Sequence, residues 1–298
     1  MADFAIAWLD QREALDQAAR NPLLLEQLLH WRAGRKKLNI MDLGTGTGSN
    51  FRFLAPRLGG RQEWLLLDKD LRLLAGLPPR LQGWALALNL EVRYQESAVC
   101  VRGAQTDYYV KYRLLDLAAG LSSLDLQGVD LVTASALLDL VSRNWCETLA
   151  VSCRKAGAAV FITLSYDGKV HWHPEDPDDE QIRHWVNQHQ LTDKGFGPAL
   201  GLHATHYLAD LLKCLDYRVY LGRGDWRLGI SDGEVQGVLA KGFTQAAKAI
   251  VPDSAIRVDA WLERRIKMLA RSTLTVGHLD LFAKLSAANN RTGYPHPS

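Results

Sequence analysis

Cysteine is scarce in this sequence, and its placement excludes two common designs. The 298 residues include only four cysteines, at positions 100, 146, 153 and 214. They form no C-x-x-C pair and no dense set, so neither a disulfide-stapled secreted domain nor a zinc cluster is expected. Asp3 and Asp10 interrupt the start of the chain, and no basic flank precedes an apolar block. We therefore expect no signal peptide, and reduced thiols in a cytoplasmic protein.

Long apolar runs and an excess of one charge are also missing. No stretch approaches the roughly 18 consecutive apolar residues that a membrane span needs. Lys and Arg number 35 against 33 Asp and Glu, which gives a net charge of +2. The most basic segment, Arg32–Lys37, is short, and we interpret it as a solvated loop. Neither a membrane nor a nucleic acid is expected as a partner, since nucleic acid usually leaves a larger basic footprint.

The pattern that is present alternates buried strands with helices. Apolar runs predict strands over 38–42, 63–68, 129–133 and 158–164, and an alternation of apolar and polar residues predicts another over 108–115. Two helices are expected over 3–31, and a hairpin around Gly103 is expected to place its last strand in the sheet. A final run, Thr273–Ala283, alternates apolar and polar residues. This order predicts a mostly parallel sheet with helices on both faces and a ligand at the carboxyl ends of the strands.

A glycine-rich loop, Asp42-Leu43-Gly44-Thr45-Gly46-Thr47-Gly48, follows the first strand. Glycines at alternate positions let the backbone turn and let a ligand come close. The helix start after them offers unpaired N–H groups to a polar ligand. A dinucleotide-binding loop requires G-x-G-x-x-G, and the position of its third glycine is occupied here by Ser49. A dehydrogenase is therefore the weakest of the functions considered.

The D-x-G-x-G-x-G order resembles that of class I S-adenosylmethionine-dependent methyltransferases. In that family the acid that ends the second strand, here Asp68, takes both ribose hydroxyls, and a carboxylate can accept two such donors. The resemblance implies that Asp42 acts near the methionine amino group and that Asp116 meets the adenine amino group. Ser135 belongs to the rim that faces the methyl group. The cofactor-binding residues that the resemblance implies are Asp42, Gly44, Thr45, Gly46, Gly48, Asp68, Lys69, Leu115, Asp116 and Ser135.

The resemblance covers roughly residues 36–285 and implies an α/β fold. The expected sheet is Rossmann-like, mostly parallel and seven-stranded, with an antiparallel last strand and helices on both faces. We expect a single methyltransferase domain, 1–298, with N-terminal helices (1–35) ahead of a cofactor-binding core (36–230 and 272–285). A helical insertion (231–271) is expected before the last strand, and 287–298 is expected to be a disordered tail.

The family places substrate-specific elements after the fifth strand, here within 166–206. The catalytic candidates in this part of the chain are Tyr166, His171, His173 and Lys194. The two histidines share a face of an extended segment, but no further ligand has a fixed spacing from them, so no metal is expected. The alternatives stay open that Tyr166 is a rim aromatic and that the histidine-rich loop is structural. Asp139, which stands amid apolar residues, is either a substrate contact or the polar face of its helix, and the second interpretation is favoured.

We therefore expect methyl transfer from S-adenosylmethionine to a small-molecule acceptor. The fourth-strand rim reads Thr133-Ala134-Ser135, which departs from the Asn-Pro-Pro-Tyr type of enzymes that methylate base amines. Two alternatives to methyl transfer keep the same cofactor. The protein could catalyse another group transfer or an elimination, or it could be a catalytically silent partner subunit that binds the cofactor. A homodimer also stays open. The acceptor is not specified, because one fold supports many chemistries.

Overall fold

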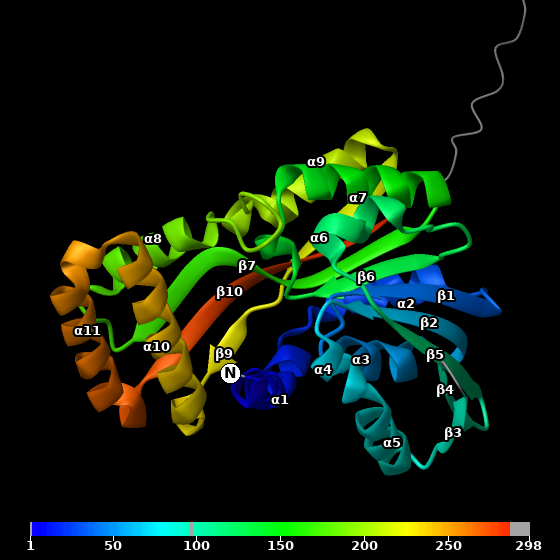
Figure 1. The fold of residues 1–298 in the computed structure, drawn as a ribbon, viewed down its shortest axis with the longest axis horizontal. Coiled ribbons are helices and arrows are strands. Elements are labelled where there is room, and N and C mark those ends of the chain that lie inside the picture. Colours follow the sequence, from blue (N-terminus) through cyan, green and yellow to red (C-terminus); the bar gives the residue numbers. More distant parts are fainter. Residues whose placement is uncertain (1, 96–97, 287–298) are drawn as a thin grey trace, which may run out of the picture.

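The computed structural model describes residues 2–95 and 98–286, and its centre is one ten-stranded sheet (Figure 1). The strands are β1 (Lys37–Leu43), β2 (Gly60–Asp68), β3 (Glu91–Gln95), β4 (Ala98–Gly103), β5 (Thr106–Leu114), β6 (Leu131–Ser135), β7 (Ala159–His173), β8 (Tyr217–Arg223), β9 (Trp226–Leu228) and β10 (Thr273–Leu285). Their order is β3-β4-β5-β2-β1-β6-β7-β10-β8, with β9 paired to β10.

Helices connect these strands. They are α1 (Ala2–Ala19), α2 (Pro22–Arg32), α3 (Ser49–Leu58), α4 (Leu71–Ala75), α5 (Leu77–Ala87), α6 (Leu117–Gly120), α7 (Arg143–Ala156), α8 (Asp179–Gln190), α9 (Ala204–Cys214), α10 (Gly233–Ile250) and α11 (Ala255–Met268). A short 3₁₀ turn, η2 (Leu138–Leu140), follows β6. Among the residues that the structure describes, no helix is both long and apolar enough to cross a membrane. The tail predicted over 287–298 lies outside those residues.

The predicted fold class is confirmed. The strands β5, β2, β1, β6 and β7 run parallel, whereas β10 is antiparallel to both β7 and β8. The chain moves outward from β1 in one direction and then returns to continue from β6, so the switch point lies between these two strands. The seven strands β5-β2-β1-β6-β7-β10-β8 form the expected Rossmann-like sheet with an antiparallel last strand, and β3, β4 and β9 extend it.

Helices bury both faces of the sheet. Phe161 and Ile162 are neighbours in β7, and successive side chains of a strand point to opposite faces. Phe161 packs with Leu28 of α2 and Phe51 of α3, whereas Ile162 packs in the cluster that contains Leu149 of α7. Strands buried on both faces read as continuous apolar runs, which is why the sequence shows them clearly.

The strand β7 continues beyond the parallel sheet. The sequence pattern predicts a strand that ends at Leu164 and a polar loop after it, but β7 extends to His173. The extension forms because Val170 and Trp172 are buried while His171 and His173 stay exposed, and because Trp172 pairs with Leu274 of β10. The helices α8, α10 and α11 pack near this extension, away from the main sheet (Figure 1).

Arg265 anchors α11 to this outer part of the molecule. Its side chain is fully buried, and its Nε donates to Asp179 Oδ1 at 3.0 Å. Its Nη1 donates to the carbonyl oxygen of Pro174 at 2.7 Å, and its guanidinium lies over the Trp172 ring. Because one guanidinium joins α11, α8 and the end of β7, we expect the three segments to unfold together.

Replacement of Arg265 by methionine is expected to lower the free energy of unfolding by about 3–5 kcal/mol. The loss arises because Asp179 keeps its charge without its partner in a largely buried place. Urea denaturation followed by circular dichroism measures the change. Arg271→Met at an exposed position serves as the control, and equal stability of the two variants would refute the anchoring role.

Candidate functional site

The glycine loop turns sharply at the carboxyl end of β1. Gly44, Gly46 and Gly48 have φ of 66°, 57° and 81°, in the left-handed region that side chains rarely adopt. A Cβ at Gly48 would also lie 2.8 Å from Leu77 Cδ2. The Thr45 amide donates to the Leu67 carbonyl oxygen at 2.9 Å, which ties the loop to the end of β2. The alternate glycines are therefore required by the backbone itself.

Asp68 holds the loop from the end of β2. Its Oδ2 accepts the amide N–H of Gly46 at 2.8 Å, and its Oδ1 accepts that of Asp70 at 2.9 Å. Each oxygen of an ionised carboxylate can accept a second hydrogen bond. Asp68 therefore combines a fixed position at the loop with remaining capacity for hydroxyl donors.

Asp42 is fully buried behind the loop. Its Oδ1 accepts Asn50 Nδ2 at 2.7 Å, whereas its Oδ2 has no hydrogen-bond partner. Burial raises the pKa of Asp42 to about 6, although the Thr45 hydroxyl, the Asn50 hydrogen bond and the charge of Arg20 act in the opposite direction. A buried acceptor without a donor is costly, and the Thr45 hydroxyl, which also has no other partner, is a donor available to it within the loop.

A cavity of about 200 Å³ opens between this loop and α1. Its lining residues are Leu9, Arg12, Asp16, Gly44, Thr45, Gly46, Thr47, Ser49, Asn50, Asp68, Leu73, Ser135 and Ala136. The N-terminal helix α1 thus forms one wall of the cavity. It is held there by ion pairs of Glu13 with Arg52 and of Asp10 with Arg80. The sequence contains no local signal for this wall, because it forms between distant segments.

Five of the predicted cofactor residues do not line this cavity: Asp42, Gly48, Lys69, Leu115 and Asp116. Asp116 is exposed, and its Oδ1 accepts the Ala118 amide at 2.9 Å and caps α6. The Leu115 amide donates to the Asp68 carbonyl oxygen at 2.8 Å. A Cβ added at Gly195 would lie 3.8 Å from Lys69 Nζ, which places Lys69 beside the Asp193–Gly201 loop.

The turn after β6 packs against the glycine loop. Ala136 has a φ of 54°, an uncommon backbone conformation for a residue with a side chain. This turn brings Leu137 to 3.4 Å from the position of a Cβ at Gly44. The Leu200 amide donates to the Val141 carbonyl oxygen at 2.9 Å and so fastens the 193–201 loop over η2. The 193–201 loop thus lies close to Lys69, one of the predicted cofactor residues.

The structure does not bring the four predicted catalytic residues together. His171 lines a different cavity, of about 280 Å³, with Glu175 and Glu180, and His173 is exposed at the end of β7. The Tyr166 hydroxyl donates to Asn187 Oδ1 at 2.7 Å, and burial raises its pKa.

Lys194 contacts two side chains near the end of α8, His189 and Thr192. Its Nζ is 3.1 Å from His189 Nδ1 and 3.0 Å from Thr192 Oγ1. Burial lowers the pKa of Lys194, and the charge of Asp139 acts in the opposite direction. Among the residues described here, no three His, Cys, Asp or Glu side chains are grouped to hold a metal ion.

Asp139 is a candidate for which the sequence interpretation favoured the polar face of a helix over a substrate contact. It lies in η2 with 7% of its surface exposed, and it accepts the backbone N–H groups of Asp139 itself and of Tyr166. Burial raises its pKa to about 6, while the charges of Arg12 and Lys194 act in the opposite direction. The sequence feature that could have indicated this role is an acid inside the apolar run Leu137–Leu140. A helix position that faces solvent explains the same feature.

Comparisons with known proteins give no family assignment. No family model matches the sequence, and no curated protein matches it. Among solved structures, a protein of Bacillus halodurans C-125 has 12% identity and a TM-score of 0.48, over 88% of this chain and 99% of the other. The YcgJ protein of Bacillus subtilis has 10% identity and a TM-score of 0.47, over 90% and 100%.

A third similar structure is a SAM-dependent methyltransferase of Geobacter sulfurreducens solved with S-adenosyl-L-homocysteine. It has 14% identity and a TM-score of 0.42, over 89% of this chain and 92% of the other. At these identities, the function of this chain has to be inferred from its own sheet and site.

Proposed function

We propose that this protein transfers a methyl group from S-adenosylmethionine to a small-molecule acceptor in the cytoplasm. The observation that carries the proposal is the pair of acids at the glycine loop. Asp68 is fixed against the Gly46 amide, and buried Asp42 keeps one oxygen without a partner. Such acceptors suit a ligand with both hydroxyl and ammonium donors. The ribose and the amino-acid group of S-adenosylmethionine carry these donors.

The main contribution of the chain to catalysis would be to position the methyl donor and the acceptor relative to each other. When bound, S-adenosylmethionine would supply an electrophilic methyl carbon on a sulfonium, and the thioether S-adenosylhomocysteine would leave as the acceptor atom bonds to that carbon in line. Orientation of the two reactants is worth about 7–11 kcal/mol. The glycine loop would contact the methyl donor on one side, and Leu9 of α1 would cover the donor on the other. Leu9 Cδ1 lies 3.7 Å from the position of a Cβ at Gly46.

The acceptor side of the proposal rests on η2 and the loop fastened over it. We place Asp139 as the group that takes a proton from the acceptor, with Arg12 and Lys194 as the cations that face it. A base of this kind contributes typically about 10²–10⁴-fold. Contacts of Tyr166, His171 and His173 with the acceptor stay predictions, as does a homodimer.

The first test is binding, because it does not need the acceptor. Isothermal titration calorimetry is expected to show that S-adenosylmethionine and S-adenosylhomocysteine both bind. The second test incubates the protein with S-adenosylmethionine carrying a ¹³C-methyl group and a small-molecule extract of bacterial cells. Mass spectrometry should find a product that has gained the labelled methyl. Absence of any binding would refute the proposal.

The alternatives predict different results in the same experiments. Another group transfer or an elimination would consume the cofactor without placing the labelled methyl on a product. A catalytically silent partner subunit would bind S-adenosylhomocysteine but would turn over nothing alone, and it would co-purify with an active subunit. The paired acids and the fastened 193–201 loop support the methyl-transfer proposal over the silent subunit.

A further inference from the structure

Two cations from remote parts of the chain face Asp139. The charges of Arg12 in α1 and of Lys194 in the 193–201 loop both act on this acid. Neither forms an ion pair with it within residues 2–95 and 98–286, because Asp139 accepts backbone N–H groups instead. The acid and the two cations therefore stand near one another without using up each other's hydrogen-bonding capacity.

Arg12 is held rigidly at the wall of the glycine-loop cavity, which it lines. Its Nε donates to Asp16 Oδ2 at 3.0 Å and its Nη2 to Asp16 Oδ1 at 3.2 Å, and its guanidinium lies over the Trp226 ring. Trp226 Nε1 also donates to Asp16 Oδ1 at 3.0 Å. Within the part of the chain that the structure describes, Nη1 of Arg12 donates to no group. Asp16 balances the charge of Arg12, but one edge of the guanidinium remains for a ligand.

Lys194 supplies a charge that no carboxylate contacts. Its Nζ lies 3.1 Å from His189 Nδ1 and 3.0 Å from Thr192 Oγ1, and neither group is an anion. Among the described residues Lys194 forms no ion pair. An ammonium has three donors, so at least one donor of this partly buried lysine is free for a ligand.

The loop that carries Lys194 is fixed to η2 and to the start of α7. Ala199 forms an antiparallel bridge with Ser142, which caps α7. The Phe196 ring meets the Trp145 ring edge to face, with centroids 6.0 Å apart. These contacts involve no ligand, so the position of Lys194 relative to η2 is set by the fold itself.

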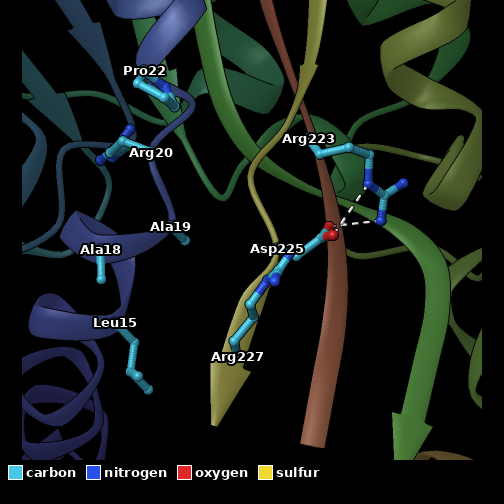
Figure 2. Close-up of a pocket in the computed structure, with 8 residues that line it drawn as sticks. All are labelled: Leu15, Ala18, Ala19, Arg20, Pro22, Arg223, Asp225 and Arg227. Atoms are coloured by element: carbon cyan, nitrogen blue, oxygen red, sulfur yellow. Dashed lines mark hydrogen bonds and ion pairs between the residues drawn. The ribbon is translucent and has the colours of Figure 1, made fainter.

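The cations of a second cavity are paired within the protein. This cavity, of about 370 Å³, lies between the end of α1 and the β8–β9 connection (Figure 2). Figure 2 shows Arg223 engaged by Asp225, with Nη2 2.6 Å from Oδ1, and Arg223 also pairs with Asp167. The charge of Arg20, which lines the same cavity, is offset by three acids: Asp280, Asp16 and Asp42. The cations beside Asp139 are therefore the better place for an anion.

We propose that the methyl acceptor carries an anionic group, a carboxylate or a phosphate, which binds Lys194 and the free edge of Arg12. The inference rests on the proposed function, because it names the acceptor class for the same site. An ammonium and a guanidinium both suit such an anion. The anion is a handle and not the reacting group. A second atom of the acceptor gives its proton to Asp139 and bonds to the methyl carbon, whose bond to sulfur breaks with the electron pair left on sulfur.

The experiment sorts acceptors by charge before the reaction. A small-molecule extract of bacterial cells is passed over an anion-exchange resin at about pH 8, where carboxylates are ionised. The retained and the unretained fractions are each incubated with the protein and S-adenosylmethionine carrying a ¹³C-methyl group. Mass spectrometry is expected to find the labelled product in the retained fraction. The product should itself bind the resin, because the anionic group is not the one that is methylated.

A phosphatase treatment of the retained fraction distinguishes the two sources of the anion. Loss of labelling after the treatment identifies a phosphate monoester, and unchanged labelling identifies a carboxylate.

Two variants test the cations. Lys194→Gln and Arg12→Gln should each raise, by about 10- to 100-fold, the amount of the retained fraction that gives half-maximal rate. The affinity for S-adenosylhomocysteine should stay within about threefold. Lys194→Arg, which keeps the charge, should recover part of the loss. The control is Lys213→Gln, since Lys213 is exposed and donates to Asp210 within the same helix.

The outcomes separate this inference from the proposed function. A labelled product only in the unretained fraction, or a product that has lost its negative charge, refutes the anionic handle while methyl transfer stands. The same holds if Lys194→Gln and Arg12→Gln both behave like Lys213→Gln. If Arg12→Gln does not fold, the two fractions and Lys194→Gln still decide. No labelled product from either fraction overturns the proposed function, and this inference with it.

Discussion

Replacement of Gly46 by arginine is expected to abolish binding of S-adenosylhomocysteine. Gly46 has a φ of 57° and lines the cavity, so arginine would strain the loop and place a long side chain between the loop and Leu9 of α1. The Gly46 amide also loses its alignment with Asp68. We expect an affinity loss of at least about 100-fold, or about 2.8 kcal/mol, measured by isothermal titration calorimetry.

The control for this variant is Gly34→Arg. Gly34 also has a positive φ, 82°, but it is exposed and a Cβ there meets nothing within 4 Å. Both variants carry the backbone cost of about 1–2 kcal/mol, and only Gly46→Arg should lose the ligand. Asp68→Ala should show a similar loss through its missing acceptors. Unchanged affinity in Gly46→Arg would place the ligand elsewhere and would refute the site.

Asp139→Asn is expected to lower kcat/KM for methyl transfer by about 10²–10⁴-fold, the usual contribution of a general base. Asparagine keeps the size of the side chain but cannot take a proton. The rate is measured with the acceptor found by methyl labelling, and the affinity for S-adenosylhomocysteine should stay within about threefold of that of the unaltered chain. Asp125→Asn, an exposed acid that accepts the Gln127 amide, is the control.

The pH dependence gives a second readout of the same residue. Burial raises the pKa of Asp139 to about 6, against the charges of Arg12 and Lys194. A base with a raised pKa is protonated, and thus inactive, as the pH falls below that value. In the unaltered chain, log kcat/KM should fall with a slope of about one below this pH. A variant that keeps both the rate and this acidic limb would show that Asp139 only supports the structure.

Much of the fold is readable from local sequence. The strands β1, β2, β6 and the first part of β7 are apolar runs because they lie inside the sheet, and the alternation in Thr273–Ala283 marks the antiparallel strand between β7 and β8. The acids at strand ends, Asp42 and Asp68, and the glycines between them are contiguous or separated by one helix. Their spacing is therefore fixed by the chain, and the sequence alone is enough to indicate the ligand site.

The sequence predicts the acceptor-binding residues less well than the cofactor-binding loop. The reason is that the acceptor site depends on contacts between distant segments. His171 and His173 form a local pattern, yet the burial of Val170 and Trp172 turns the segment into a strand and directs the histidines away from the loop cavity. Asp139 looks like a solvent-facing helix position until the 193–201 loop closes over η2. Burial changes the chemistry of an acid, and burial is not a property of neighbouring residues in sequence.

The sequence by itself determined the sheet, the loop that crosses its carboxyl edge and the two acids beside that loop. Periodicity and glycine conformation act over a few residues, so these features need no knowledge of the rest of the chain. Tertiary structure alone decided that α1 forms a wall of the cavity and that Asp139 is buried. It also decided that Arg20 is buried against Ser135 and Thr163. These outcomes depend on which distant segments the fold brings into contact, and that cannot be known from neighbouring residues in sequence.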